Sequence, residues 1–259
     1  MTNPLTNETH THTTHCWWNP DQARWVCASP GLPVDRPASS DRPLVDVRDM
    51  LVVHTALLRE FRLAPAAVRR TTRGDRKQAR AVDGHVGLLC DMLHHHHAGE
   101  DELLWPKLRD RTPPAALADI EHVEAQHHGL DAALADVHDL RAAWVDDPTA
   151  EAGDELAAGL ARLHTLLADH LDLEESRLLP MAASVLTPAE WKEIGDHGAA
   201  STPKSMLMLA FGMFAYEGDP AVLRDMLASA PPPVRALVPR IAPRAYAKRA
   251  RRVYGTARP

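Results

Sequence analysis

The chain has 259 residues, of which 45% are apolar and 25% are charged, and its net charge is −6. These values are typical of a globular protein large enough to bury a core, and the acidic balance argues against a nucleic-acid-binding protein. Alanine, leucine and arginine dominate while β-branched and aromatic residues are sparse, which favours helix over sheet.

The numbers of cysteines and histidines further limit the classes of protein to which this chain could belong. Cys16, Cys27 and Cys90 fit no metal-finger spacing, so we expect reduced thiols in a cytoplasmic protein. No apolar run is long enough to span a membrane, and the N-terminus lacks the apolar core of a secretory signal. Sixteen histidines occur, against roughly six for average usage. Metal ligation is the commonest reason for such an excess.

Residues 1–44 are rich in Thr, Asn, Pro, Ser and His and show no sustained period. We expect a disordered N-terminal arm. Its THTHTTHCWW cluster could bind a stray metal ion through His10, His12, His15 and Cys16, but a flexible polar tail is the favoured interpretation.

Residues 45–183 have the pattern of a helical bundle. Apolar residues recur at helical spacing from about 46 to Ala64-Pro65, from about 75 to 109, from Pro113-Pro114 to about 145, and from about 151 to 182. Short connections rich in Pro, Gly and Asp separate these segments. The sequence therefore predicts an all-α fold built on an up-down-up-down four-helix bundle.

Residues 184–259 predict a helical C-terminal extension. Thr187-Pro188-Ala189-Glu190 is a capping box with proline at the first helical position. A further helix begins at Thr202-Pro203 and is apolar on almost every side, so we expect it against the bundle or a partner chain, with 203–217 as a candidate homodimer surface. Residues 235–259 carry eight Lys/Arg and no acid. A solvated face, or docking onto the acidic bundle, is favoured there over an acidic partner, nucleic acid or a membrane surface.

A repeat distinguishes among the many histidines. LHHHHAGEDELLWP at 93–106 aligns on its proline with ADHLDLEESRLLP at 168–180, so that one His-x-x-x-Glu pair falls on the other. A lone histidine precedes each copy at nearly the same distance along the chain. Apolar residues follow these two histidines at the same offsets. The predicted set is therefore His54, His96, Glu100, His127, His170 and Glu174.

The spacing of this set points to a metal site. Residues i and i+4 lie on one helix face, so each pair aims an imidazole and a carboxylate at one point. Burying four imidazoles and two carboxylates without a cation would be costly. Two carboxylates between two cations form a dinuclear bridged site, for which iron is expected before manganese or zinc.

The other histidines of the bundle are weaker candidates for metal ligands. His128 is the alternative to His127 if the register differs by one residue. His85 lies about 16 Å along the helix from His96, so a core or supporting role is expected. His94, His95 and His97 are expected to be exposed or to lie outside the ligand shell.

Residues 46–182 resemble the hemerythrin-like HHE cation-binding domains, on the lone histidines, the His-x-x-x-Glu pairs and the Leu-x-Pro endings quoted above. The resemblance implies a non-haem di-iron centre with His54, His96, His127 and His170 as terminal ligands and Glu100 and Glu174 as bridges. The oxygen-carrying members have a His-x-x-x-His pair on their third helix, which this sequence lacks. The resemblance therefore implies reaction with nitric oxide or peroxide, or iron handling, before reversible oxygen carriage.

The leading functional hypothesis is a cytoplasmic di-iron protein that senses or reacts with oxygen, peroxide or nitric oxide. If the protein is an enzyme, peroxide decomposition is the simplest reaction, because no Ser/His/Asp set, phosphate loop or dinucleotide fingerprint competes. The alternatives are an iron storage, delivery or sensing protein without turnover, and a structural or interaction bundle with 203–217 as a dimer or partner surface.

Overall fold

The computed structural model describes residues 16–19, 24–27 and 43–259. The predicted disordered arm therefore falls mostly outside the described residues, as do His10, His12 and His15. Within the arm, strands β1 (Cys16–Asn19) and β2 (Arg24–Cys27) pair antiparallel, with Cys16 opposite Cys27. The sequence analysis did not predict this hairpin, because four residues are too few to establish an alternating pattern.

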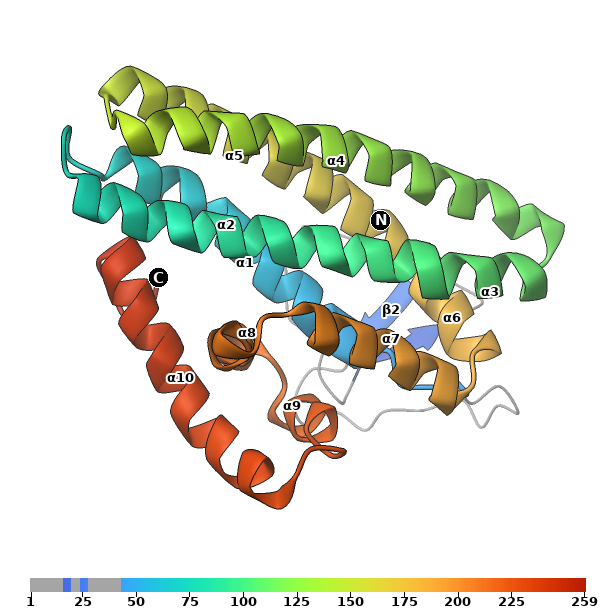
Figure 1. Ribbon diagram of the computed structural model, residues 1–259. Coiled ribbons are helices and arrows are strands. Elements are labelled where there is room, and N and C mark those ends of the chain that lie inside the picture. Colours follow the sequence, from blue (N-terminus) through green and yellow to red (C-terminus); the bar gives the residue numbers. More distant parts are fainter. Residues whose placement is uncertain (1–15, 20–23, 28–42) are drawn as a thin grey trace, which may run out of the picture.

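Four long helices form the predicted bundle (Figure 1). They are α1 (Arg48–Arg69), α2 (Arg76–Gly99), α4 (Leu117–Asp146) and α5 (Ala150–Leu173). Helix α1 packs against α2 and α5, and α4 packs against the same two helices. Short connections join successive helices, so neighbours run antiparallel. The mainly helical architecture predicted from the sequence is confirmed.

Local sequence signals fix most of the helix ends. The Asp75 side chain accepts a hydrogen bond from the Gln78 amide at the start of α2, and Thr149 caps α5 in the same way. The predicted end of α1 at Ala64-Pro65 is wrong, because α1 continues through Pro65 to Arg69. Pro65 removes one backbone hydrogen bond. The buried side chains of Ala64, Ala67 and Val68 pack into the core and offset that loss.

Two of the bundle helices contain a wider turn at corresponding positions. Helix α2 continues through a π-helical segment, η1 (Glu100–Leu104), into α3 (Trp105–Arg111). Helix α5 continues through η3 (Glu174–Leu178) into α6 (Leu179–Val185). The Trp105 and Leu179 amides bond to the carbonyls five residues earlier. A proline follows each of these residues, and because it cannot donate to the carbonyl four residues back, it favours the wider turn.

Four further helices cover one side of the bundle. They are α7 (Pro188–Ser201), α8 (Lys204–Glu217), α9 (Pro220–Met226) and α10 (Pro232–Tyr254). Within the bundle, a short 3₁₀ segment, η2 (Pro114–Ala116), joins α3 to α4. The predicted capping box at Thr187 and Glu190 is confirmed. No helix in the described part of the chain is long and apolar enough to cross a membrane.

Helices α8 and α10 share the bundle core. Met213 of α8 and Tyr246, Ala250 and Val253 of α10 belong to the same buried apolar cluster as the facing sides of α1, α2, α4 and α5. Gly212 permits the close approach of α8 to α10, because a Cβ there would clash with the backbone of Ala242. The extension is thus packed against the bundle through apolar contacts.

A buried polar cluster, the Glu60 cluster, reinforces this attachment. The Glu60 carboxylate on α1 accepts hydrogen bonds from Tyr246 (2.5 Å) and Tyr254 (2.7 Å) of α10, and lies 2.8 Å from His85 Nε2 on α2. Arg59 donates to Glu60 at 2.9 Å, to the Met213 carbonyl at 3.0 Å, and to Glu217 of α8. The cluster thus joins α1, α2, α8 and α10, and places His85 in the core, which is one of the two roles expected of it.

Candidate metal site

The six predicted residues converge inside the bundle from four helices. His54 lies on α1 and His127 on α4, while His96 and His170 lie near the ends of α2 and α5. Glu100 and Glu174 are the first residues of η1 and η3. All are buried except His96, whose side chain retains 11% exposure.

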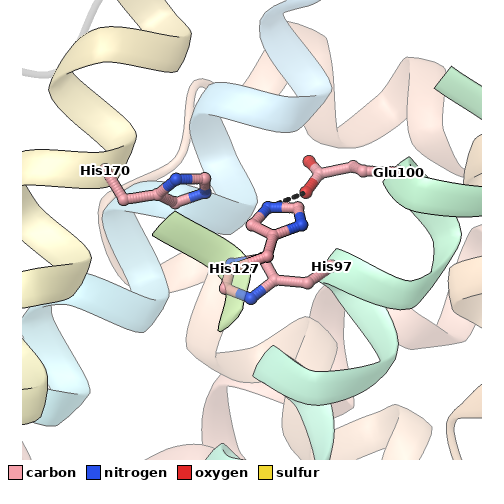
Figure 2. Close-up of side chains that lie close together, drawn as sticks. All are labelled: His97, Glu100, His127 and His170. Carbon is pink, nitrogen blue, oxygen red and sulfur yellow. Dashed lines mark ion pairs between the residues drawn. The ribbon is translucent and has the colours of Figure 1, made fainter. Parts of the chain in front are cut away.

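The ligand atoms form two groups, each spanning no more than 4.8 Å. The first comprises His54, His96, Glu100 and Glu174, and the second His97, Glu100, His127 and His170. Figure 2 shows the second group, in which His97 and Glu100 come from the continuous helix formed by α2 and η1, and His127 and His170 come from two other helices. Glu100 belongs to both groups, so the two positions are adjacent.

The distances define how the carboxylates lie between the groups. Glu100 Oε1 is 3.2 Å from His96 Nε2, and its other oxygen is 3.6 Å from His127 Nε2. Glu174 Oε2 is 3.8 Å from His54 Nε2 and 3.6 Å from His170 Nε2. Each glutamate therefore faces a histidine of both groups.

His97 is the member that the sequence analysis missed. It was expected to be exposed or outside the ligand shell, but it is 2% exposed, and its ring stacks on that of His127 with centroids 4.2 Å apart. The repeat contains a signal that could have identified it. His97 aligns with Leu171 of the second copy, and Leu171 is a buried core residue. An apolar residue at the matching position indicates an inward-facing site.

The remaining histidines lie outside the two groups. His128 is exposed, and its Nδ1 lies 3.0 Å from the Glu124 carbonyl of its own helix. The register that points His127 inward is therefore the one expected from the repeat. His94 and His95 are exposed.

The buried polar atoms of the site suit a cation. Both oxygens of Glu100 and of Glu174, Nε2 of His127 and His170, and both ring nitrogens of His97 have no hydrogen-bond partner among the described residues. Leaving buried polar atoms unpaired would cost about 1–3 kcal/mol for each atom. Imidazole nitrogens and carboxylate oxygens that converge in this way fit a transition-metal ion.

Comparison with protein families agrees with this geometry. The profile of the hemerythrin HHE cation-binding domain matches residues 45–182, more than half of the chain. The chain belongs to this family. No curated protein and no solved structure matches it.

Burial in this hemerythrin-family chain shifts the pKa values of the site residues toward their neutral forms. Burial, together with the neighbouring Glu174 carboxyl, holds the pKa of Glu100 well above its usual range. Burial also raises the pKa of Glu174, against the opposing effect of His54. Burial and neighbouring imidazoles hold the pKa of His96 and His97 well below the usual range and lower that of His170 to about 3. These imidazoles are therefore neutral, as metal ligation requires.

Two acidic side chains orient the lone histidines from outside the ligand groups. Asp101 Oδ1 lies 2.8 Å from His127 Nδ1, and Glu175 Oε1 lies 2.9 Å from His54 Nδ1. Each carboxylate fixes the Nδ1–H tautomer, which leaves the Nε2 lone pair free to face the site. Gln126 stands 3.4 Å from Nδ1 of His170. Such carboxylate–histidine pairs are the common outer support of metal sites.

Proposed function

We propose that this chain is a non-haem di-iron protein whose two metal positions are bridged by Glu100 and Glu174. The observation that carries the proposal is the position of Glu100, whose two oxygens face histidines of different ligand groups. Glu174 also approaches one histidine of each group. A carboxylate with this placement suits a pair of cations better than a single ion.

The donors favour iron over the alternatives. The first group offers two imidazoles, and the second offers three once His97 is counted. Mixed imidazole and carboxylate ligation with positions left for an exogenous ligand suits iron, with manganese or zinc as second choices. His97 of α2 supplies a fifth histidine. The second copy of the repeat has no histidine at the matching position.

We further propose that the centre senses or reacts with a small oxidant in the cytoplasm. When bound by these histidines and glutamates, reduced iron would supply the electrons for reaction with oxygen, peroxide or nitric oxide, and peroxide decomposition would be the simplest turnover. The protein's part is to exclude bulk water, since the core leucines that flank the site are buried. The partly exposed edge of His96 offers the approach for a molecule of a few atoms. The acidic partners of His54 and His127 hold those rings in place.

The first experiment is metal analysis of protein produced with supplemental iron. We expect about two iron ions per chain, with little manganese or zinc, and almost none in a Glu100→Ala/Glu174→Ala variant. His94→Ala is the matched control, because His94 belongs to the same histidine run but is exposed. Loading of zinc in preference to iron, or equal iron in all three proteins, would overturn the di-iron assignment.

The second experiment separates reaction with an oxidant from iron storage or delivery. Reduced, iron-loaded protein is mixed anaerobically with oxygen, peroxide or nitric oxide, and the visible absorption is followed. A rapid change with retention of iron supports sensing or reaction. Spectra that do not respond, combined with release of the iron to a chelator, would instead favour storage or delivery.

A further inference from the structure

The first part of α10 is a helix largely without a partner. The side chains at 231–237 and 239–241 are exposed on every side of the helix. Figure 1 shows this half of α10 directed away from the bundle, while its C-terminal half lies against it. Helical turns gain most of their stability from packing. An uncovered stretch of this length is therefore a candidate contact surface.

One face of α10 combines apolar and cationic residues. Val234, Leu237 and Ile241 are 37%, 52% and 44% exposed and recur at helical spacing. The same spacing continues along the helix. The α10 face is therefore defined by Val234, Leu237, Ile241, Ala245, Lys248 and Arg252.

The charge of this region opposes that of the rest of the chain. Residues 226–259 contain eight Lys/Arg and no acid, although the whole chain has a net charge of −6. Arg240 and Arg244 hydrogen-bond to carbonyls of their own helix, and Arg249 to the Gly84 carbonyl. Because carbonyl oxygens are neutral, the contacts of Arg240 and Arg244, which are both exposed, leave their positive charges available to an anionic partner.

The face widens where α8 joins it. A shallow groove of about 300 Å³ runs between the two helices, lined by Met206, Met208 and Leu209 of α8 and by Lys248 and Arg252 of α10. The neighbouring Leu207 is 39% exposed. Apolar side chains flanked by cations thus extend from α10 onto α8.

We propose that the α10 face docks this protein onto the surface of an anionic lipid bilayer. Exposed aliphatic side chains suit the acyl boundary, and the arginine and lysine side chains beside them suit lipid phosphates. A second copy of this chain that paired through the same face would place like charges against one another. A nucleic acid would leave the aliphatic stripe without a partner, because phosphates bind cations alone.

The test is binding of the full, metal-loaded chain to vesicles, measured by sedimentation. Vesicles of phosphatidylcholine mixed with phosphatidylglycerol should bind at least roughly tenfold better than pure phosphatidylcholine, and added sodium chloride should weaken the binding. Arg244→Glu/Lys248→Glu should reduce binding by roughly thirtyfold or more, and Leu237→Ser/Ile241→Ser by roughly tenfold.

Matched controls lie elsewhere on the surface. Leu166→Ser removes an exposed leucine of α5, and Arg73→Glu/Arg80→Glu reverses two exposed cations, and neither should change binding. All variants should keep their helix content and iron. Equal binding to both vesicle types, or equal loss in the controls, overturns the proposal. So does tighter binding to duplex DNA or polyglutamate, or dimerisation that Leu237→Ser/Ile241→Ser abolishes.

Discussion

The acidic residue after each site glutamate supports a histidine on another helix. Asp101 follows Glu100 but contacts His127 of α4, and Glu175 follows Glu174 but contacts His54 of α1. Each half of the repeat thus holds a ligand of the other helix pair. Because both contacts are made to Nδ1, both rings present Nε2 to the site.

Neutralising these acids should weaken metal binding without unfolding the protein. For Asp101→Asn and Glu175→Gln we expect roughly 10–100-fold lower iron affinity, because ring orientation and basicity are both lost. Competition with a coloured chelator measures this affinity. Glu102→Gln is the control, since Glu102 is an exposed acid on the same turn. Affinities equal to that of the parent in both variants would show that the pairs are not functional.

His97 allows a test in which affinity and stability move in opposite directions. The second repeat has a buried leucine at the matching position, Leu171, so His97→Leu fits the helix. Metal-free protein should become more stable by about 1–3 kcal/mol, because two buried unpaired nitrogens are removed. Iron content should fall by about one ion, because the second group loses a ligand. Unchanged iron, measured by elemental analysis, would place His97 outside the ligand set.

At the scale of the element, a π turn begins at each of the two glutamates. The sequence predicted that each histidine and the glutamate four residues later share a face, and the two side chains of each pair lie 3.2 Å and 3.6 Å apart. The sequence analysis did not predict η1 and η3, because the apolar periodicity of a long helix changes little when one turn contains an extra residue. The signal was present in the Trp105-Pro106 and Leu179-Pro180 pairs, whose prolines disfavour a continuous α-helix.

Replacing these prolines should reduce the stabilisation that the protein gains from binding iron. Pro106→Ala and Pro180→Ala restore a donor, so the turns can relax to α-helix and displace Asp101 and Glu175, which lie within them, from the histidines that they contact. We expect the rise in Tm on adding iron to shrink in both variants. Pro65→Ala, in α1 and away from the π turns, should raise Tm with and without iron alike. Full retention of the iron-dependent rise in Pro106→Ala would contradict this role.

At the scale of the molecule, the repeat and the apolar periodicity sufficed to predict the bundle, but not how the extension attaches to it. The Glu60 cluster joins residues far apart in the chain, such as Glu60, His85 and Tyr246. Single polar residues carry no period, and their pairing depends on the tertiary packing of α10. Only the buried position of His85 could be anticipated from its place on the inward face of α2.

Glu60 should be among the most sensitive positions outside the metal site. Glu60→Gln keeps the volume but removes the buried anion of the Arg59 guanidinium, which keeps only the partly exposed Glu217 carboxylate, and this should cost about 3 kcal/mol or more. A Tm lower by roughly 5–10 °C is expected from thermal unfolding. Asp154→Asn breaks only the exposed pair with Arg69 and should cost less than about 1 kcal/mol. Equal effects of the two substitutions would mean that the Glu60 cluster does not hold the extension in place.

The same carboxylate predicts how this stabilisation depends on pH. Burial alone would raise the pKa of Glu60, but His85, Arg59 and Tyr246 outweigh it and lower the pKa to about 2. With a depressed folded-state pKa, the contribution is complete above the ordinary value of 4.5 and is lost as pH falls toward about 2. The difference in unfolding free energy between the parent and Glu60→Gln should therefore shrink over this range. The side chains of the proposed metal site are the same in both proteins, so their contribution cancels in the comparison. A difference that stays constant from pH 5 to pH 2, measured by urea unfolding, would show that Glu60 is not held as a carboxylate.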